Sequence, residues 1–379
     1  ALSLQGVTWT LQVDFVLFTG DLVFNGTVAR HFNEAKEVLF DSLCSSLNIL
    51  KENIIFCPGN HDIDRDQIRY AHENYIKDRI TSNSEINLLY NGKVSDRFIS
   101  EDLLKPLANY NAFLQSYHND NDLNVFGNLH SIHYRMYQNQ KIAFICLYTP
   151  WLCNMDKAGT GNDYSNLLFP SEVFNDIEMS LDKDVSRRIV LMHHPLSFLK
   201  EFNAYEIENQ LYENYDMLFV GHVHKMSNVV RHTGNNGIYE HTSKASLSNK
   251  ETLGCSFISN DDIESNIFNV SEITYIKDSN ECHWGQTIVV TIPVGSEKED
   301  LNRIRKKLYE KINIEKDNAN NLLLLKEEDG GKDFLSSYNP PLIRTSKDNT
   351  SSQSVASVIS LSDIYLAQNH IIILGKDKC

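Results

Sequence analysis

Four short apolar segments, each followed directly by a polar loop, constrain the fold of this chain more than any other feature. They cover residues 13–18, 53–57, 187–192 and 217–220. Each is brief, apolar and rich in residues that favour strands, which is typical of a strand buried on both faces. Stretches with helical spacing lie between them, as at residues 27–47 and 204–214. We therefore expect an α/β fold in which buried strands alternate with helices.

The loops that follow these strands share one kind of side chain. They read Gly20-Asp21, Gly59-Asn60-His61-Asp62, His193-His194-Pro195 and Gly221-His222-Val223-His224. In open α/β sheets, ligands bind outside the carboxyl ends of the strands. The pattern therefore predicts that four loops, far apart in the sequence, converge on one site.

The residue types in these loops indicate a metal centre. Carboxylates and imidazoles bind Mn, Fe, Zn or Ni, and an asparagine can supply a carbonyl oxygen. The two oxygens of Asp21 can bridge two ions. The remaining positions would be filled by Asn60, His193, His222 and His224. Two ions about 3.5–4 Å apart can bind phosphate oxygens and activate a bridging hydroxide.

The same loops suggest a proton donor. His61 follows Asn60 directly, so we expect it to protonate the leaving oxygen, with Asp62 orienting its ring and raising its pKa. A Gly-Asp pair alone is common, and His-His-Pro alone is compatible with a helix start, so the prediction depends on the four loops together. The other histidines are interpreted as surface or core residues, and His241 is the one to test for proximity to the site.

Charge, hydrophobicity and cysteine content limit which partners and which cellular environment we expect for this protein. The formal net charge of −15 over 379 residues argues against a broad nucleic-acid-binding surface, although it leaves room for a nucleotide substrate held by metal ions. No stretch approaches the roughly 20 apolar residues of a membrane span. The seven cysteines are scattered without a Cys-x-x-Cys pair, which favours reduced thiols in a cytoplasmic protein.

The ordered series GDLVFNG, CPGNHD, LMHHPL and FVGHVH resembles the calcineurin-like metallophosphoesterase superfamily. The resemblance covers residues 1–293 and implies a four-layer α-β-β-α sandwich with two mixed sheets flanked by helices. It implies hydrolysis of phosphomonoesters or phosphodiesters with two divalent metal ions, manganese being favoured. The implied substrate is a phosphoester, which includes nucleotides and nucleic acids. From the lack of a long apolar stretch we expect no membrane partner.

The resemblance also assigns roles to single residues. Asp21 would be the bridging ligand, and His193, the first histidine of its pair, is preferred to His194. Asn60, His193 and His222 would complete one ion site, and His224 would belong to the other. His61 would be the general acid, supported by Asp62.

One motif of that family is missing. Its members begin with a strand that ends in Asp-x-His, which supplies ligands to the ion that His224 also binds. No such motif precedes Asp21, and Asp14 opens the same strand at its opposite end. Either the motif lies upstream of Ala1, or the chain is a variant with a weak or single ion site and low activity. A degenerate fold that binds a metal or a partner without turnover is the alternative function.

The last part of the chain differs in composition. Residues 294–360 contain a charged stretch with helical character and polar segments typical of a linker. Residues 361–379 end in an apolar run before Gly375-Lys376, which resembles the start of the phosphate loop of P-loop NTPases, although a terminal strand fits as well. This arrangement resembles bacterial STAND or NACHT-type defence proteins, in which oligomerisation of an NTPase region switches on an N-terminal enzyme.

Overall fold

The computed structural model describes most of residues 2–292 and two short strands beyond them. The described ranges are 2–4, 7–9, 12–68, 70–92, 99–119, 122–153, 163–233, 236–246, 253–260, 265–292, 343–344 and 358–359. The chain divides into two compact units, residues 1–306 and 307–379. In the second unit, β16 (Ile343–Arg344) pairs with β17 (Val358–Ile359). The predicted charged helix and the predicted phosphate loop lie outside the described residues.

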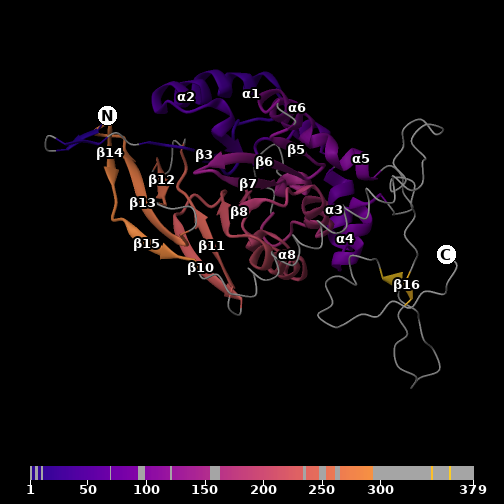
Figure 1. Ribbon diagram of the computed structural model, residues 1–379. Helices are drawn as coiled ribbons and strands as arrows, with labels where there is room; N and C mark the ends of the chain where they lie inside the picture. Colours follow the sequence, from indigo (N-terminus) through magenta and orange to yellow (C-terminus); the bar gives the residue numbers. More distant parts are fainter. Residues whose placement is uncertain are drawn as a thin grey trace, which may run out of the picture. The chain divides into compact units, whose positions relative to one another are not determined.

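A seven-stranded mixed sheet forms the centre of the first unit (Figure 1), in the order β10-β11-β9-β8-β7-β6-β5. Its strands are β5 (Asn124–Phe126), β6 (His130–Tyr137), β7 (Gln140–Leu147), β8 (Val185–Met192), β9 (Met217–Val220), β10 (Ser227–Thr233) and β11 (Asn236–Thr242). Neighbours from β7 through β8 and β9 to β11 are parallel, and the outer pairs are antiparallel. The carboxyl ends of β8 and β9 therefore lie at the same edge.

The remaining strands form smaller sheets. β3 (Val16–Phe18) pairs with β4 (Ile54–Phe56) in parallel, with Phe18 opposite Phe56. An antiparallel sheet is built from β12 (Leu253–Ser259), β13 (Ile267–Ile276), β14 (Glu281–Trp284) and β15 (Ile288–Thr291). β1 (Leu2–Leu4) and β2 (Val7–Trp9) form a hairpin.

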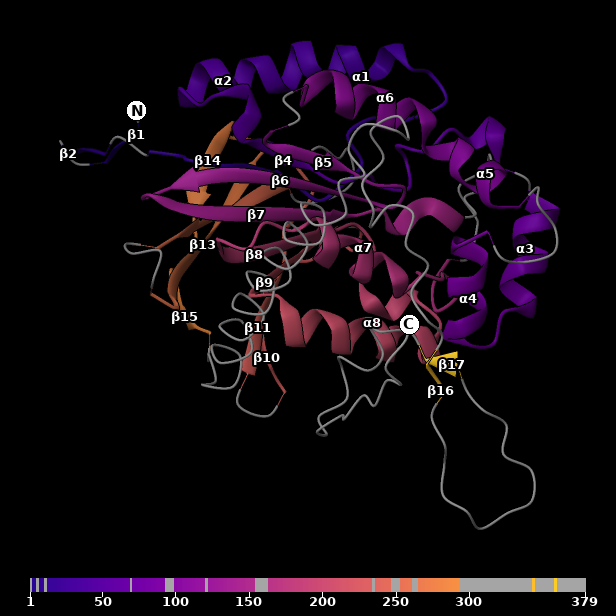
Figure 2. The same ribbon diagram turned by 45° about the vertical axis from the view of Figure 1, so that its right-hand side comes forward.

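Helices cover the strands on both sides (Figure 2). The helices are α1 (Arg30–Ala35), α2 (Asp41–Leu47), α3 (Tyr70–Arg79), α4 (Asn83–Tyr90), α5 (Ile99–Leu104), α6 (Ala108–Tyr117), α7 (Glu172–Ser180) and α8 (Glu201–Asn214). A π-helical turn (Lys36–Phe40) joins α1 to α2. Helices α1, α2 and α6 lie on one side of β4–β7, and α8 lies beside β10 and β11 (Figures 1 and 2). None of the described helices is long and apolar enough to cross a membrane.

Aromatic side chains join the first helices to the strands that carry the loops. Phe40 and Phe56 are fully buried, with ring centroids 5.4 Å apart, and Phe18 lies 5.3 Å from Phe40. On the other side Phe56 contacts Phe113 and Tyr117 of α6. Burial of one such side chain stabilises a fold by roughly 1.5–3 kcal/mol. This packing holds β3 and β4 in position and thereby fixes the starting points of their loops.

The observed elements confirm the predicted α/β class, a large mixed sheet with flanking helices. Apolar runs correctly located β3, β4, β8 and β9, and the predicted helical stretches at residues 27–47 and 204–214 fall on α1, α2 and α8. Strands β5 and β10 are among those that the four apolar runs did not locate. They are short or polar edge strands whose pairing is defined by neighbours in the sheet.

Candidate metal centre

The four predicted loops meet around the ring of His193. Its Nε2 atom lies 2.8 Å from Oδ1 of Asn60 and 3.1 Å from Nδ1 of His222. The same atom lies 3.5 Å from Oδ1 of Asp21. These residues follow β4, β8, β9 and β3, so the structure brings together four side chains from four separate strand ends.

A backbone contact sets the tautomer of His193. Its Nδ1 atom lies 2.7 Å from the carbonyl oxygen of Thr19, which can only accept a hydrogen bond. Nδ1 therefore carries the proton, and in the neutral ring Nε2 presents a lone pair. That lone pair faces oxygen and nitrogen atoms that carry lone pairs of their own. Such a set of donors converging on one point fits a divalent cation of the Mn, Fe, Zn or Ni type.

The charge state of Asp21 suits a metal ligand. Burial opposes ionisation of its carboxyl, but His193 and His61 lie close by and the backbone N–H of His61 donates to Oδ1 over 3.0 Å. The balance lowers the pKa of Asp21 below its ordinary value. Asp21 is therefore an anion at neutral pH, as a bridging or terminal ligand must be.

The ring of His222 is neutral at the same pH. Burial, followed by the proximity of His193, lowers its pKa to about 4, and His224 contributes in the same direction. Both ring nitrogens can then offer a lone pair in one tautomer or the other. His224 lies two residues further along the same loop with an exposed side chain, whereas the three groups that converge on Nε2 of His193 are those of Asp21, Asn60 and His222.

His194 belongs to the same histidine cluster but faces other partners. The ligand atoms of His193, His194 and His222 all lie within 4.8 Å of one another. Nδ1 of His194 lies 3.1 Å from the Thr149 hydroxyl, and Nε2 lies 4.0 Å from the thiol of Cys153. Both of its ring nitrogens thus have partners away from Asp21 and Asn60, which agrees with the preference for His193.

Three of the candidate ligands have a left-handed backbone. The φ angles are 58° at Asp21, 67° at His222 and 52° at His224. Residues other than glycine adopt this region at a cost, of order 1–3 kcal/mol each, and such residues cluster at functional sites. The neighbouring Gly59 is required for a different reason. A Cβ there would lie 2.2 Å from both the backbone nitrogen and Oδ1 of Asp21, so a side chain at this position would displace the ligand.

Asp62 holds the loops in place and does not contact the ring of His61, in contrast to the sequence-based expectation. Its fully buried carboxylate accepts hydrogen bonds from the backbone N–H groups of Leu22, Val23 and Gly59 at 3.1, 2.9 and 2.8 Å. Burial and the charge of Asp21 raise its pKa to about 7, against the effect of these three bonds. The side chain thus ties the loop after β3 to the loop after β4.

The ring of His61 is oriented by two groups that the sequence did not indicate. Its Nδ1 atom lies 3.1 Å from the carbonyl oxygen of Phe24 and 3.0 Å from the guanidinium of Arg65. The first contact requires a proton on Nδ1 and the second requires a lone pair, so each belongs to a different protonation state. A backbone carbonyl leaves no signal in the sequence, and only the folded loops reveal this contact.

A buried polar chain runs from the histidine cluster to helix α3. Cys153 donates to Asp163 over 2.7 Å, and Lys77 of α3 pairs with the same carboxylate at 3.1 Å. Lys77 and Asp163 are 86 positions apart, so spacing in the sequence could not link them. His241, by contrast, bonds with Asn228 and neighbours on β10 and β11, and in the described residues it makes no contact with the cluster.

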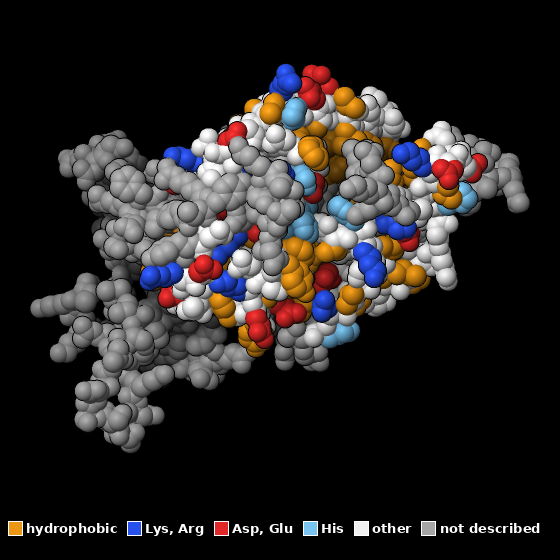
Figure 3. Space-filling view, turned by 180° about the vertical axis from the view of Figure 1, so that it is seen from behind, with side chains coloured by type: hydrophobic (Ala, Val, Ile, Leu, Met, Phe, Trp, Pro, Cys, Tyr) orange, Lys and Arg blue, Asp and Glu red, His pale blue; other side chains and the backbone are white. Residues whose placement is uncertain are grey.

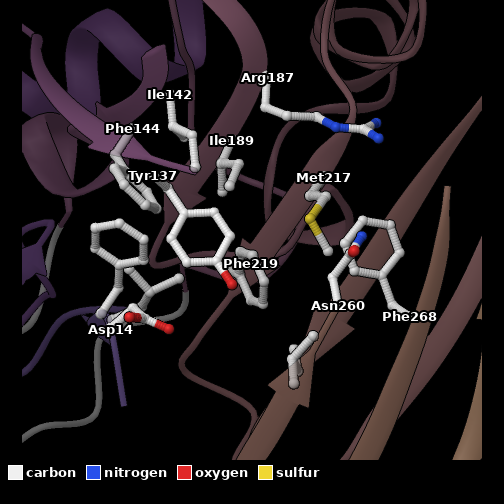
Figure 4. A pocket seen from close by; sticks show the side chains of 13 residues that line it. Asp14, Tyr137, Ile142, Phe144, Arg187, Ile189, Met217, Phe219, Asn260 and Phe268 are labelled. Carbon is white, nitrogen blue, oxygen red and sulfur yellow. The ribbon is translucent and has the colours of Figure 1, made fainter. Parts of the chain in front are cut away.

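A cavity elsewhere in the molecule is not part of this site (Figure 4). It has a volume of about 170 Å³ and is lined by side chains from β3, from the inner face of the large sheet and from β12 and β13. Asp14 lies at its edge, at the opposite end of β3 from Asp21. None of the candidate ligands lines it, and most of its walls are apolar.

Fold and site together have the features expected of a member of the metallophosphoesterase class. The sequence model of the calcineurin-like phosphoesterase family matches residues 7–226, which is more than half of the chain. The chain belongs to this family, whose members typically bind divalent metal ions.

A curated relative was also found. The chain is similar to the uncharacterized metallophosphoesterase-like protein YydB of Bacillus subtilis (strain 168), with 25% identity over 268 residues. The match covers 69% of this chain and 51% of the relative, so the chain spans about half the length of the curated relative that it matches.

Proposed function

We propose that this chain hydrolyses phosphomonoesters or phosphodiesters with a divalent cation, manganese being favoured, held by Asp21, Asn60, His193 and His222. The convergence of three ligand atoms on Nε2 of His193 supports this proposal most directly. A cation bound there supplies charge stabilisation for the phosphate oxygens and a hydroxide nucleophile at neutral pH.

The chain's own residues supply the other requirements of the reaction. Asp21 is ionised, and the clamp at Asp62 fixes the loops that carry it. When the ring of His61 is doubly protonated, the carbonyl of Phe24 holds Nδ1–H, and Nε2–H is left to protonate the leaving oxygen. The guanidinium of Arg65 lies 3.0 Å from the same Nδ1 and can donate to it only in the neutral tautomer whose proton is on Nε2.

The acidic balance of the chain favours a small substrate over long nucleic acid. With a formal net charge of −15, the surface as a whole repels a polyanion. A nucleotide or another small phosphoester is therefore the proposed substrate class. A role as the effector of a bacterial defence protein, switched by an oligomerising NTPase region, rests on the sequence of residues 361–379 alone.

A single experiment separates an enzyme from a binding module. Hydrolysis of p-nitrophenyl phosphate and bis(p-nitrophenyl) phosphate is measured with Mn²⁺, for this chain and for one extended upstream of Ala1. We expect turnover that Asp21→Asn and His61→Ala reduce at least 100-fold. His283→Ala, on the exposed strand β14, is the matched control and should be silent. Bound manganese without any turnover in either chain would refute the enzyme and favour the binding module.

Metal content tests the second ion site. Asp21, Asn60, His193 and His222 would complete one site, and no Asp-x-His motif precedes Asp21 in this sequence. We expect about one tightly held ion per chain by elemental analysis after dialysis. Two tightly held ions would show that His224 and other residues build a full second site.

A further inference from the structure

Phe24 is exposed beside the proposed general acid. Its side chain is 83% exposed, more than any other large hydrophobic side chain in the described residues. Its ring centroid lies 5.5 Å from that of His61, with the two planes inclined by 34°. A single exposed hydrophobic residue is ordinary on a protein surface. This one is notable because it contacts the ring that would donate a proton to the substrate.

The backbone holds Phe24 in this position. The two residues before it, Leu22 and Val23, donate to the buried carboxylate of Asp62. Two residues after it, the N–H of Gly26 donates to the carbonyl of His61 over 2.8 Å. The carbonyl of Phe24 itself faces Nδ1 of His61. An exposed aromatic ring on a loop that is tied at both ends is preorganised to bind a flat partner at small entropic cost.

A second aromatic pair contacts the ligand cluster. The ring of Phe198 lies 4.6 Å from His222, and Tyr164, which is 60% exposed, packs edge-on against Phe198 at 5.3 Å. On the face shown in Figure 3, histidine side chains gather near the middle and hydrophobic side chains border them. The surroundings of the phosphate site are therefore aromatic as well as polar.

We propose that Phe24 is the subsite for the leaving group and selects phosphoesters whose leaving group carries a flat ring, nucleosides above all. The inference rests on the proposed function. In hydrolysis water loses one proton to solvent and its oxygen forms a new P–O bond, while the P–O bond to the leaving group breaks. The leaving oxygen takes a proton from His61 and departs as an alcohol, and His61 regains its proton from solvent. The leaving group must therefore touch His61, and Phe24 lies against that ring.

The test compares two substrates with the same leaving oxygen. Adenosine 5′-monophosphate and ribose 5-phosphate differ by the base. If the chain acts on diesters, the methyl esters of these two compounds replace them as substrates. Stacking of a base on an aromatic side chain implies that Phe24→Ala lowers kcat/KM for the adenosine substrate about 5- to 150-fold. The ribose substrate should change less than about 2-fold. Phe24→Trp should restore the adenosine rate, and Tyr205→Ala, an exposed aromatic on α8, should affect neither.

Each other outcome has a distinct meaning. An equal loss on both substrates would overturn the proposal, because Phe24 would then only position His61. If no substrate is turned over, the proposed function fails, and calorimetric binding of adenosine 5′-monophosphate with Mn²⁺ decides the subsite alone. Weaker binding by Phe24→Ala supports the subsite, and unchanged binding refutes it.

Discussion

Replacement of Lys77 by methionine removes one partner of an ion pair that water barely reaches. The side chains of Lys77 and Asp163 are 1% and 7% exposed, and Nζ lies 3.1 Å from Oδ1. Methionine keeps most of the volume of lysine, so the change removes charge rather than packing. It also leaves the carboxylate of Asp163 with the Cys153 thiol as a neutral partner.

The magnitude follows from distance and burial. Two unit charges 3.1 Å apart attract each other by about 5 kcal/mol at an effective dielectric constant of about 20. Deletion of one partner of a buried pair costs roughly 3–5 kcal/mol, because the other charge stays buried after its counter-charge is removed. We therefore expect Lys77→Met to lower the free energy of unfolding by about 3–5 kcal/mol. Total stabilities are about 5–15 kcal/mol, so this loss is large.

Urea unfolding followed by circular dichroism measures the effect. With a slope near 3 kcal/mol per molar, the midpoint should fall by about 1–1.7 M. The matched control is Lys141→Met, whose pairs with Asp182 and Asp184 are partly exposed and should contribute about 1 kcal/mol or less. The double variant Lys77→Met with Asp163→Asn should lose less than the sum of its two single changes. A loss below about 1 kcal/mol, or strict additivity in the cycle, would refute the reasoning.

Two further predictions concern the site and the core. Gly59→Ala should weaken Mn²⁺ binding at least 10-fold without loss of secondary structure, because the new Cβ would lie 2.2 Å from Oδ1 of Asp21. Calorimetry measures the affinity, and the control Gly285→Ala, whose Cβ would meet its nearest atom at 3.4 Å, should bind Mn²⁺ unchanged. Unaltered affinity in Gly59→Ala would contradict the geometry. Burial lowers the pKa of His130 to about 4, against about 6.5 in the unfolded chain. Between these values the unfolded chain binds more protons, so the stability that this histidine contributes is lost as pH falls from about 6.5 to 4. His130→Leu should remove about 2 kcal/mol of the stability difference between pH 7 and pH 5 in urea unfolding, and an unchanged difference would show that this histidine is not the cause.

The sequence predicted those parts of the molecule that depend on local pattern. The apolar runs identified β3, β4, β8 and β9, because a strand buried on both faces needs a continuous apolar segment. Placement of polar residues directly after these strands was enough to predict that Asp21, Asn60, His193 and His222 would meet. β3 and β4 are parallel in one sheet and β8 and β9 are parallel in another, so within each sheet the carboxyl ends lie at one edge. The packing of the two sheets then brings these edges together.

The role of Asp62 was predicted wrongly for an equally physical reason. A carboxylate next to a histidine in the sequence suggested a partner for the ring. In the fold the side chain points the other way and satisfies three backbone N–H groups, two of which belong to a loop about 40 positions earlier. Backbone groups carry no sequence signature, so neither this clamp nor the carbonyl of Phe24 at His61 could be foreseen.

The sequence by itself determined which side chains can bind a metal and at which strand ends they lie. Only the tertiary structure decided how they face one another: that Thr19 fixes the tautomer of His193, that an exposed Phe24 lies against His61, and that Lys77 and Asp163 close a buried ion pair across 86 positions. Local spacing decides strand and helix through hydrophobic periodicity. Contacts between side chain and backbone over long separations depend on packing, which exists only once the whole domain has folded.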